Sequence, residues 1–130
     1  MKQKIKIIVD TSIWIEYFKN TLSNSKFIEK GLNEGFVYIT GPIISELLQG
    51  VRTQKEYTML SQSIGAVPFL DCQYYDWITT GNISFSLREK GIIIPLTDII
   101  IAAVAIRNGA KIYTLDQHFK QIPAVDLYYS

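Results

Sequence analysis

Four acidic residues, far apart in the chain, occupy positions from which their side chains could meet. Asp10 and Asp116 each follow an apolar segment that is typical of a buried parallel strand. Asp98 lies in the first turn of an apolar helix, and Glu46 lies one turn inside another predicted helix. Because sites in parallel α/β sheets form at the carboxyl ends of the strands, we expect all four acids at one edge of the sheet.

Such a cluster of carboxylates indicates metal chemistry. At about 4 Å and an effective dielectric constant of about 20, each pair of like charges costs on the order of 4 kcal/mol. The cluster becomes tolerable when some acids are protonated or when a divalent cation lies among them. Oxygen ligands favour Mg²⁺ or Mn²⁺ over zinc, and these ions suit phosphate chemistry because they can activate a bound water. Glu46 could orient that water or hold a second ion.

Individual residues of this set also have ordinary structural explanations. Asp98 could cap its helix, and Glu46 could be a solvated helical side chain. We expect His118, the only histidine, to be a surface residue rather than a ligand, and Cys72, the only cysteine, to be a small core residue. With one cysteine no internal disulfide can form, so we expect a reducing compartment, the cytoplasm.

Other reaction classes find little support. The chain has no glycine-rich phosphate loop, which argues against nucleoside triphosphate binding, and no motif for an acyl-transfer nucleophile. A phosphatase of the haloacid dehalogenase type also begins with a strand followed by Asp, but it requires a second Asp where this chain has Ser12. The net charge of +1 neither indicates nor excludes a nucleic-acid partner, since a local patch would suffice.

Strands and helices alternate along the 130 residues, which predicts a three-layer α/β/α sandwich with a central parallel sheet, in a single domain over residues 1–130. The predicted strands are 4–9, 36–40, 66–70, 111–114 and 125–127. The predicted helices are 13–19, 24–33, 43–51, 54–64, 73–90, 95–109 and a short segment at 117–121. No segment is long and apolar enough to predict a membrane span.

Aromatic residues mark two of these helices. In the helix 13–19 the apolar side chains cover more than half of the circumference, so either the helix is deeply embedded or one of Trp14, Tyr17 and Phe18 faces a partner. In the helix 73–90 we expect Trp77 to lie in the core. The same expectation applies to Tyr74 or Tyr75.

Four segments carry a resemblance to a known family. They are IVDTS (8–12), SELLQG (45–50), LTDIIIAAVA (96–105) and YTLDQHF (113–119). In order and spacing they resemble the four motifs of the PIN-domain family, and in size and layout the chain looks most like the VapC-type toxins of prokaryotic toxin–antitoxin pairs. Thr114 stands where the family places a hydroxyl beside its acids, and Ser12 is a second supporting hydroxyl.

The resemblance implies a PIN-like nuclease that depends on Mg²⁺ or Mn²⁺ and cuts RNA by attack of a metal-activated water on phosphorus. Asp10, Asp98 and Asp116 would bind the metal, and Glu46 would help to position the metal or the water. Family members usually form homodimers and are silenced by a small antitoxin that lies in a groove near the active site. The apolar arc that contains Trp14 fits such a groove or a dimer face.

Two alternatives stay open within the family: a PIN nuclease that processes RNA outside a toxin–antitoxin pair, and a catalytically silent binding module. The RNA that would be cut also stays open among transfer RNA, a ribosomal stem-loop and messenger RNA. Candidate phosphate contacts are Arg52, Arg88 and Arg107, with Lys55 and Lys90.

Overall fold

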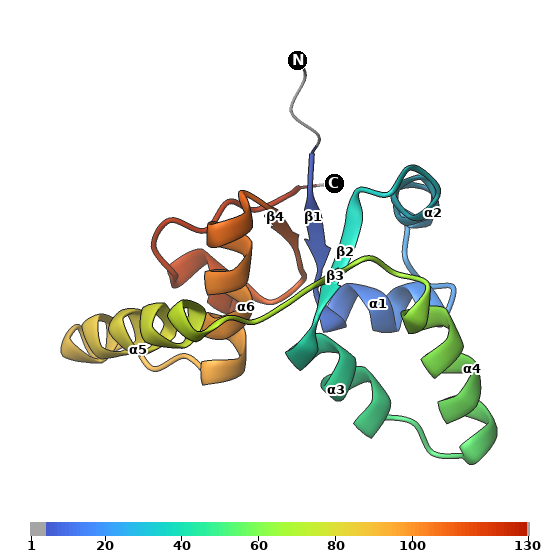
Figure 1. The fold of residues 1–130 in the computed structure, drawn as a ribbon, viewed down its shortest axis with the longest axis horizontal. Helices are drawn as coiled ribbons and strands as arrows, with labels where there is room; N and C mark the ends of the chain where they lie inside the picture. Colours follow the sequence, from blue (N-terminus) through green and yellow to red (C-terminus); the bar gives the residue numbers. More distant parts are fainter. Residues whose placement is uncertain (1–4, 130) are drawn as a thin grey trace.

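The computed structural model describes residues 5–129, which fold around a central parallel sheet (Figure 1). The sheet has four strands in the order β3-β2-β1-β4. They are β1 (Ile7–Val9), β2 (Val37–Thr40), β3 (Phe69–Leu70) and β4 (Lys111–Tyr113). In the register of the two central pairs, Ile8 lies between Tyr38 of β2 and Ile112 of β4. The predicted parallel sheet is therefore confirmed.

Helices cover both sides of the sheet, which confirms the predicted three-layer α/β/α sandwich. They are α1 (Thr11–Phe18), α2 (Ser25–Glu34), α3 (Gly41–Gln49), α4 (Gln54–Gly65), α5 (Tyr74–Glu89), α6 (Leu96–Asn108) and the 3₁₀ helix η1 (Gln117–Gln121). In Figure 1, α5 and α6 pack together to the left of the sheet, and α2 and α4 lie to its right. No helix within residues 5–129 is long and apolar enough to cross a membrane.

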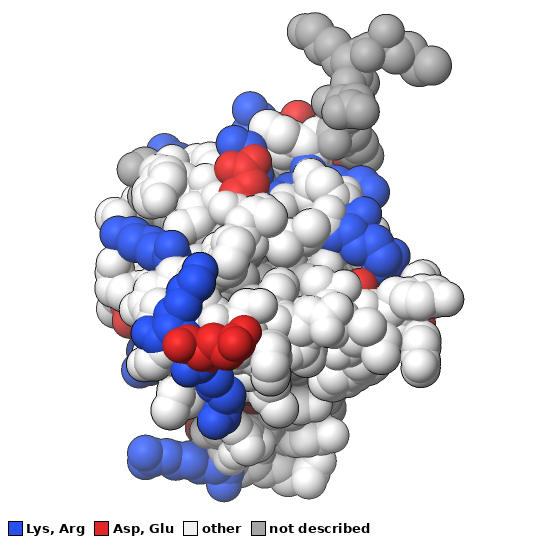
Figure 2. Space-filling view, turned by 90° about the vertical axis from the view of Figure 1, so that its left-hand side faces the viewer, with Lys and Arg blue, Asp and Glu red and all other residues white. Residues whose placement is uncertain are grey.

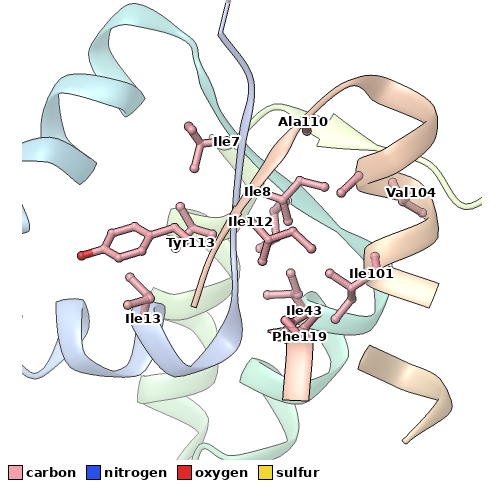
Figure 3. Packing of buried hydrophobic residues seen from close by; sticks show 14 of the residues in the cluster. Ile7, Ile8, Ile13, Ile43, Ile101, Val104, Ala110, Ile112, Tyr113 and Phe119 are labelled. Carbon is pink, nitrogen blue, oxygen red and sulfur yellow. The ribbon is translucent and has the colours of Figure 1, made fainter. Parts of the chain in front are cut away.

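The core forms because the central strands are apolar on both faces. Ile8 and Ile112 point toward α6, where Ile101 and Val104 pack against them, and Ile7 points to the opposite side (Figure 3). Eight consecutive residues of α6, Asp98–Ala105, are buried, as expected for a helix that is apolar nearly all round. An acid in the first turn of such a helix is therefore forced out of water, and it must find a partner.

The strands are shorter than predicted, β1 beginning at Ile7 and β4 ending at Tyr113, and the largest differences are in the segments 66–70 and 125–127. The segment 66–70 contributes only β3, because Ala66 and Val67 donate their N–H groups back to the last turn of α4. The segment 125–127 forms a single parallel bridge, between Ile112 and Leu127, rather than a strand. The first residue of the predicted strand 4–9 lies outside the described residues. Asp10 and Asp116 still follow the carboxyl ends of β1 and β4.

The aromatic residues of α5 correct the prediction that they belong to the core. Tyr74, Tyr75 and Trp77 are 72%, 73% and 55% exposed. The side of α5 that faces inward instead carries Asp76, Thr80 and Leu87, because an ion pair described below makes the burial of Asp76 possible. The aromatic side chains of α5 are thus left on the surface.

Candidate metal centre

Asp10 lies at the carboxyl end of β1, where its N–H donates to the carbonyl of Tyr113 at the end of β4 (2.9 Å). It is the residue before α1, yet its side chain does not cap the helix. Instead its Oδ2 accepts hydrogen bonds from the hydroxyls of Thr114 (2.7 Å) and Ser12 (3.1 Å). The structure therefore brings both predicted supporting hydroxyls onto this buried carboxylate.

Asp116 is held beside Asp10 by the same threonine. The backbone N–H of Asp116 donates to the Thr114 hydroxyl (2.9 Å), so one hydroxyl joins the two acids. At the other side, Asp116 Oδ1 accepts the backbone N–H of His118 (2.9 Å), which caps the start of η1. Asp116 thus has its position fixed by both the end of β4 and the start of η1.

Asp98 is the third residue of α6 and is only 9% exposed. The N-cap position belongs to Pro95, and no side chain caps this helix, so the capping interpretation of Asp98 is wrong. The pKa of Asp98 is raised to about 6, chiefly by burial and also by the negative charges of Asp116 and Asp10, and a hydrogen bond from His118 partly opposes this rise. The Asp98 carboxylate is therefore both buried and close enough to two other acids to interact with their charges.

Glu46 belongs to α3 and is linked to the same edge of the sheet by a hydrogen bond from α1. Its Oε1 accepts a hydrogen bond from the hydroxyl of Thr11 (3.0 Å), the residue directly after Asp10. Because its side chain is half-buried and bonded to α1, Glu46 is not the freely solvated helical residue of the alternative interpretation. Thr11 was not among the predicted site residues, although it stands inside the first motif.

His118 lies on the surface, as expected from the sequence, but it also adjoins the acidic residues. Its side chain is 48% exposed, but its Nδ1 lies 3.3 Å from Asp98 Oδ2 and 3.3 Å from Asp116 Oδ1. One ligand atom from each of the three residues lies within 4.8 Å of the other two. In the sequence, His118 stands two residues after Asp116, inside the fourth motif.

The donor set fits the dication that the family implies. Carboxylate oxygens of Asp98 and Asp116 lie close enough to share one ion, and Asp10 adjoins them through Thr114. Oxygen-rich sets of this kind bind Mg²⁺ or Mn²⁺, and such an ion would relieve the repulsion that the pKa of Asp98 reports. The four predicted acids thus lie along one edge of the sheet, with Glu46 attached through Thr11.

The predicted phosphate contacts differ in their surroundings. The guanidinium of Arg107 donates to both carboxylate oxygens of Asp76 (2.8 and 2.9 Å) and to the carbonyl of Asp71, so we withdraw it as a phosphate contact. Arg52 and Arg88 are exposed, as are Lys55 and Lys90. On the face around the tip of α5, Lys and Arg form separate groups with a broad uncharged area between them (Figure 2).

Comparison with known proteins places this geometry in a family. The sequence model of the PIN domain family matches residues 7–125 of this chain. The chain belongs to the PIN domain family. This PIN domain is 32% identical over 124 residues to ribonuclease VapC11 of Mycobacterium tuberculosis, covering 92% of each chain.

Solved structures agree with this membership at the level of the fold. The DNA-bound VapBC of Salmonella typhimurium contains a chain that superposes with a TM-score of 0.83 at 24% identity, covering 96% of this PIN domain and 98% of that chain. The promoter-bound VapBC2 of Rickettsia felis gives a TM-score of 0.82 at 20% identity, with 95% and 98% covered. The resemblance seen in the four sequence motifs is confirmed.

Proposed function

We propose that this protein is an endoribonuclease that depends on Mg²⁺ or Mn²⁺ and acts in the cytoplasm as the toxin of a VapBC-type toxin–antitoxin pair. The observation that carries the proposal is the convergence of Asp10, Asp98 and Asp116 at the carboxyl edge of the sheet. The relative VapC11 is named a ribonuclease, which supports the proposed activity. The two solved VapBC complexes support the proposed pairing with an antitoxin.

Each residue has a part in this function. Asp10, Asp98 and Asp116 would hold the dication, and Ser12 and Thr114 fix the carboxylate of Asp10 through its Oδ2. A bound dication lowers the pKa of a water and stabilises negative charge on a phosphate. Arg52 and Arg88 are exposed cations available to RNA phosphates.

Glu46 adds a carboxylate at the rim of the centre. Its hydrogen bond from Thr11 (3.0 Å) holds it at the start of α1. From there it would position the metal or accept a hydrogen bond from the attacking water. An RNA strand would enter from the exposed side of His118.

The test is RNA cleavage by the purified protein with Mg²⁺, Mn²⁺ or EDTA, comparing Asp98→Asn with the surface control Asp126→Asn. Asp126 is 67% exposed and makes only a long ion pair with Lys111 (3.8 Å). We expect Asp98→Asn to lower the rate about 1,000-fold, equal to about 4 kcal/mol of activation free energy, and the control to leave it unchanged.

Two results would contradict the proposal. Equal cleavage by wild type and Asp98→Asn would remove Asp98 from the mechanism. Absence of cleavage by wild type with both metals would favour the silent binding module instead. Cleavage without an antitoxin gene beside this one would favour the alternative of an RNA-processing nuclease.

A hollow of about 760 Å³ between α1, α3 and α4 is where we place the antitoxin. Ile15, Phe18 and Met59 give it an apolar lining, with 41%, 41% and 60% of their surfaces exposed. Trp14, by contrast, is 2% exposed, so the embedded interpretation holds for that residue. Because Glu46 lines the same hollow, a segment bound there would reach the catalytic edge.

If a short open reading frame adjoins the gene for this chain, co-expression with its product tests this placement. We expect a stable complex with wild type and at least about 10-fold weaker binding by Phe18→Glu, equal to about 1.4 kcal/mol. Ile5→Glu is the control, because Ile5 is 55% exposed and precedes β1, at the opposite end of that strand from Asp10. Equal loss in both variants would exclude this hollow as the specific site.

The α5 stripe, formed by Tyr74, Trp77, Ile78 and Phe85, is where we place a second copy of the chain. These residues share one face of the helix and are between 45% and 72% exposed. A symmetric dimer would bury the same stripe from both copies. We expect light scattering to give a dimer for wild type and a monomer for Phe85→Glu, and a monomeric wild type would contradict the placement.

A further inference from the structure

We propose that His118 is a nitrogen ligand of the metal centre and that it makes this centre prefer Mn²⁺ over Mg²⁺. The inference rests on the proposed function, because it requires that the acidic centre bind a dication. It concerns His118, which lies beside the acids but has no part in holding the metal in the proposed function.

The first argument is the position of the imidazole. Its Nδ1 lies 3.3 Å from Asp98 Oδ2 and 3.3 Å from Asp116 Oδ1. Neighbouring ligands of one octahedral ion with bonds of about 2.1 Å are separated by about 3 Å. Both spacings are therefore close to those of atoms that share one ion, and a small movement of the exposed ring would suffice.

The second argument is that His118 differs from a structural ion-pair partner. Arg107 and Asp76 show what such a pair looks like in this protein, with N···O distances of 2.8 and 2.9 Å. His118 instead stands at 3.3 Å from two carboxylates at once, beyond the usual range of about 2.7–2.9 Å for a charge-assisted hydrogen bond. This equidistant position is better suited to an ion between the three groups than to either pair alone.

The third argument is that the backbone fixes the histidine beside its neighbour. Its N–H donates to Asp116 Oδ1 (2.9 Å), so both residues belong to the same capped turn at the start of η1. The next residue, Phe119, is completely buried and holds that turn against the core. The imidazole is thus presented by a supported backbone, although half of the ring remains accessible to an entering ion.

The chemistry of nitrogen ligands gives the preference. Mg²⁺ binds almost entirely through oxygen and keeps several waters, whereas imidazole is a good ligand for transition metals. Mn²⁺ accepts both carboxylate and imidazole. A centre in which His118 joins the carboxylates therefore selects Mn²⁺ over Mg²⁺ more strongly than a centre made of acids alone.

The test uses the fact that His118 is the only histidine of the chain. In tag-free protein loaded with Mn²⁺ in nitrogen-free buffer, pulsed electron paramagnetic resonance should detect an imidazole nitrogen coupled to the ion. His118→Gln should abolish that coupling, and the neighbouring control Gln117→Ala should keep it. Calorimetry should show Mn²⁺ binding weakened about 10-fold in His118→Gln and Mg²⁺ binding changed by less than about 3-fold.

The outcomes separate this inference from the proposed function. Binding of Mn²⁺ without nitrogen coupling in the wild type would overturn the inference and leave the carboxylate centre intact. Equal weakening of Mn²⁺ and Mg²⁺ binding in His118→Gln would overturn the metal preference. Absence of binding of either ion by the wild type would refute the metal-dependent function itself.

Discussion

Asp76 and Asp98 occupy equivalent positions in two helices that pack against each other. Each is the third residue of its helix, α5 or α6, and they are only 2% and 9% exposed. Burial acts to raise the pKa of Asp76, but hydrogen bonds from Arg107 and from the backbone N–H of Gln73, with the Arg107 charge, leave it below its usual value. Burial raises the pKa of Asp98 to about 6, and the neighbouring acids add to that effect.

The difference teaches that helix position and burial do not distinguish a structural aspartate from a functional one. What distinguishes the two aspartates is the set of charged groups that face each carboxylate. Asp76 receives its counter-charge from Arg107 within the same chain, so it fixes α5 on α6. Asp98 faces Asp116 and Asp10, whose charges add to the effect of burial on its pKa, and the counter-charge that we propose for it is a bound dication. The following experiments are ordered by the size of the effect expected.

Asp76→Asn should give the largest loss of stability. It leaves Arg107, whose side chain is 33% exposed, without the charge that it pairs with. Breaking a buried ion pair costs about 3–5 kcal/mol, and partial exposure of Arg107 puts the expected loss at about 3 kcal/mol. Urea unfolding in EDTA measures it. A loss no larger than that of Asp126→Asn would show that the pair is not stabilising.

Adding a metal ion should stabilise the fold only through Asp98. At about 100 times its dissociation constant, Mn²⁺ should raise the unfolding free energy of the wild type by about 2.7 kcal/mol. The same increase is expected in Asp76→Asn, whereas Asp98→Asn should show almost none. A comparable increase in Asp98→Asn would place the binding site elsewhere.

The two aspartates should also respond to pH with opposite signs. The folded pKa of Asp98, about 6, lies above its ordinary value of 3.8, so the stability that its protonated form provides is lost as the pH rises from about 4 to 6. In EDTA this amounts to on the order of 2 kcal/mol. Asp76, with its lowered pKa, should lose its contribution as the pH falls below 3.8.

The Asp98→Asn variant isolates the first of these pH effects. Its unfolding free energy, measured between pH 4 and 7 by urea titration, should lack the Asp98 component because the amide does not titrate. At pH 7 without metal this variant should be more stable than the wild type by about 1–2 kcal/mol. Parallel pH profiles for the two proteins would contradict the repulsion inferred at the centre.

The smallest effect is expected from Thr114→Val. The variant keeps the shape of the side chain but removes the hydrogen bond to Asp10 and the acceptor for the Asp116 N–H. Two lost hydrogen bonds, each worth about 0.5 kcal/mol at this partly exposed position, lower the unfolding free energy by about 1 kcal/mol. Cleavage should fall about 10-fold, equal to about 1.4 kcal/mol, because two ligands lose a common support. Unchanged cleavage would show that Thr114 is dispensable.

The sequence was sufficient to predict the sheet and the acidic edge, because both depend on local patterns. Apolar runs before Asp10 and Asp116 indicate strand ends, and parallel strands bring their ends together. The Asp76–Arg107 pair could not be predicted in this way. Its two residues are separated by 31 positions, and neither has a pattern that shows its partner. Arg107 was consequently interpreted as a phosphate contact, and the aromatic residues of α5 as core.

The contact of His118 with Asp98 could not be predicted for a different reason. Its neighbour Asp116 was recognised, but the contact with Asp98 depends on how η1 turns back toward the first turn of α6. That turn is held by the cap from Asp116 and by the burial of Phe119 in the core. A short 3₁₀ segment gives no periodic pattern from which the direction of one side chain can be inferred.

The bond between Thr114 and Asp10 joins residues 104 positions apart. The 104 residues that lead from Asp10 to Thr114 must therefore be synthesised before β4 can pair with β1 and bring Asp116 beside Asp10. Until then the carboxylates of Asp10 and Asp116 are separate. The acidic edge of the sheet is thus created by the pairing of β1 with β4 and not by any local segment of the chain.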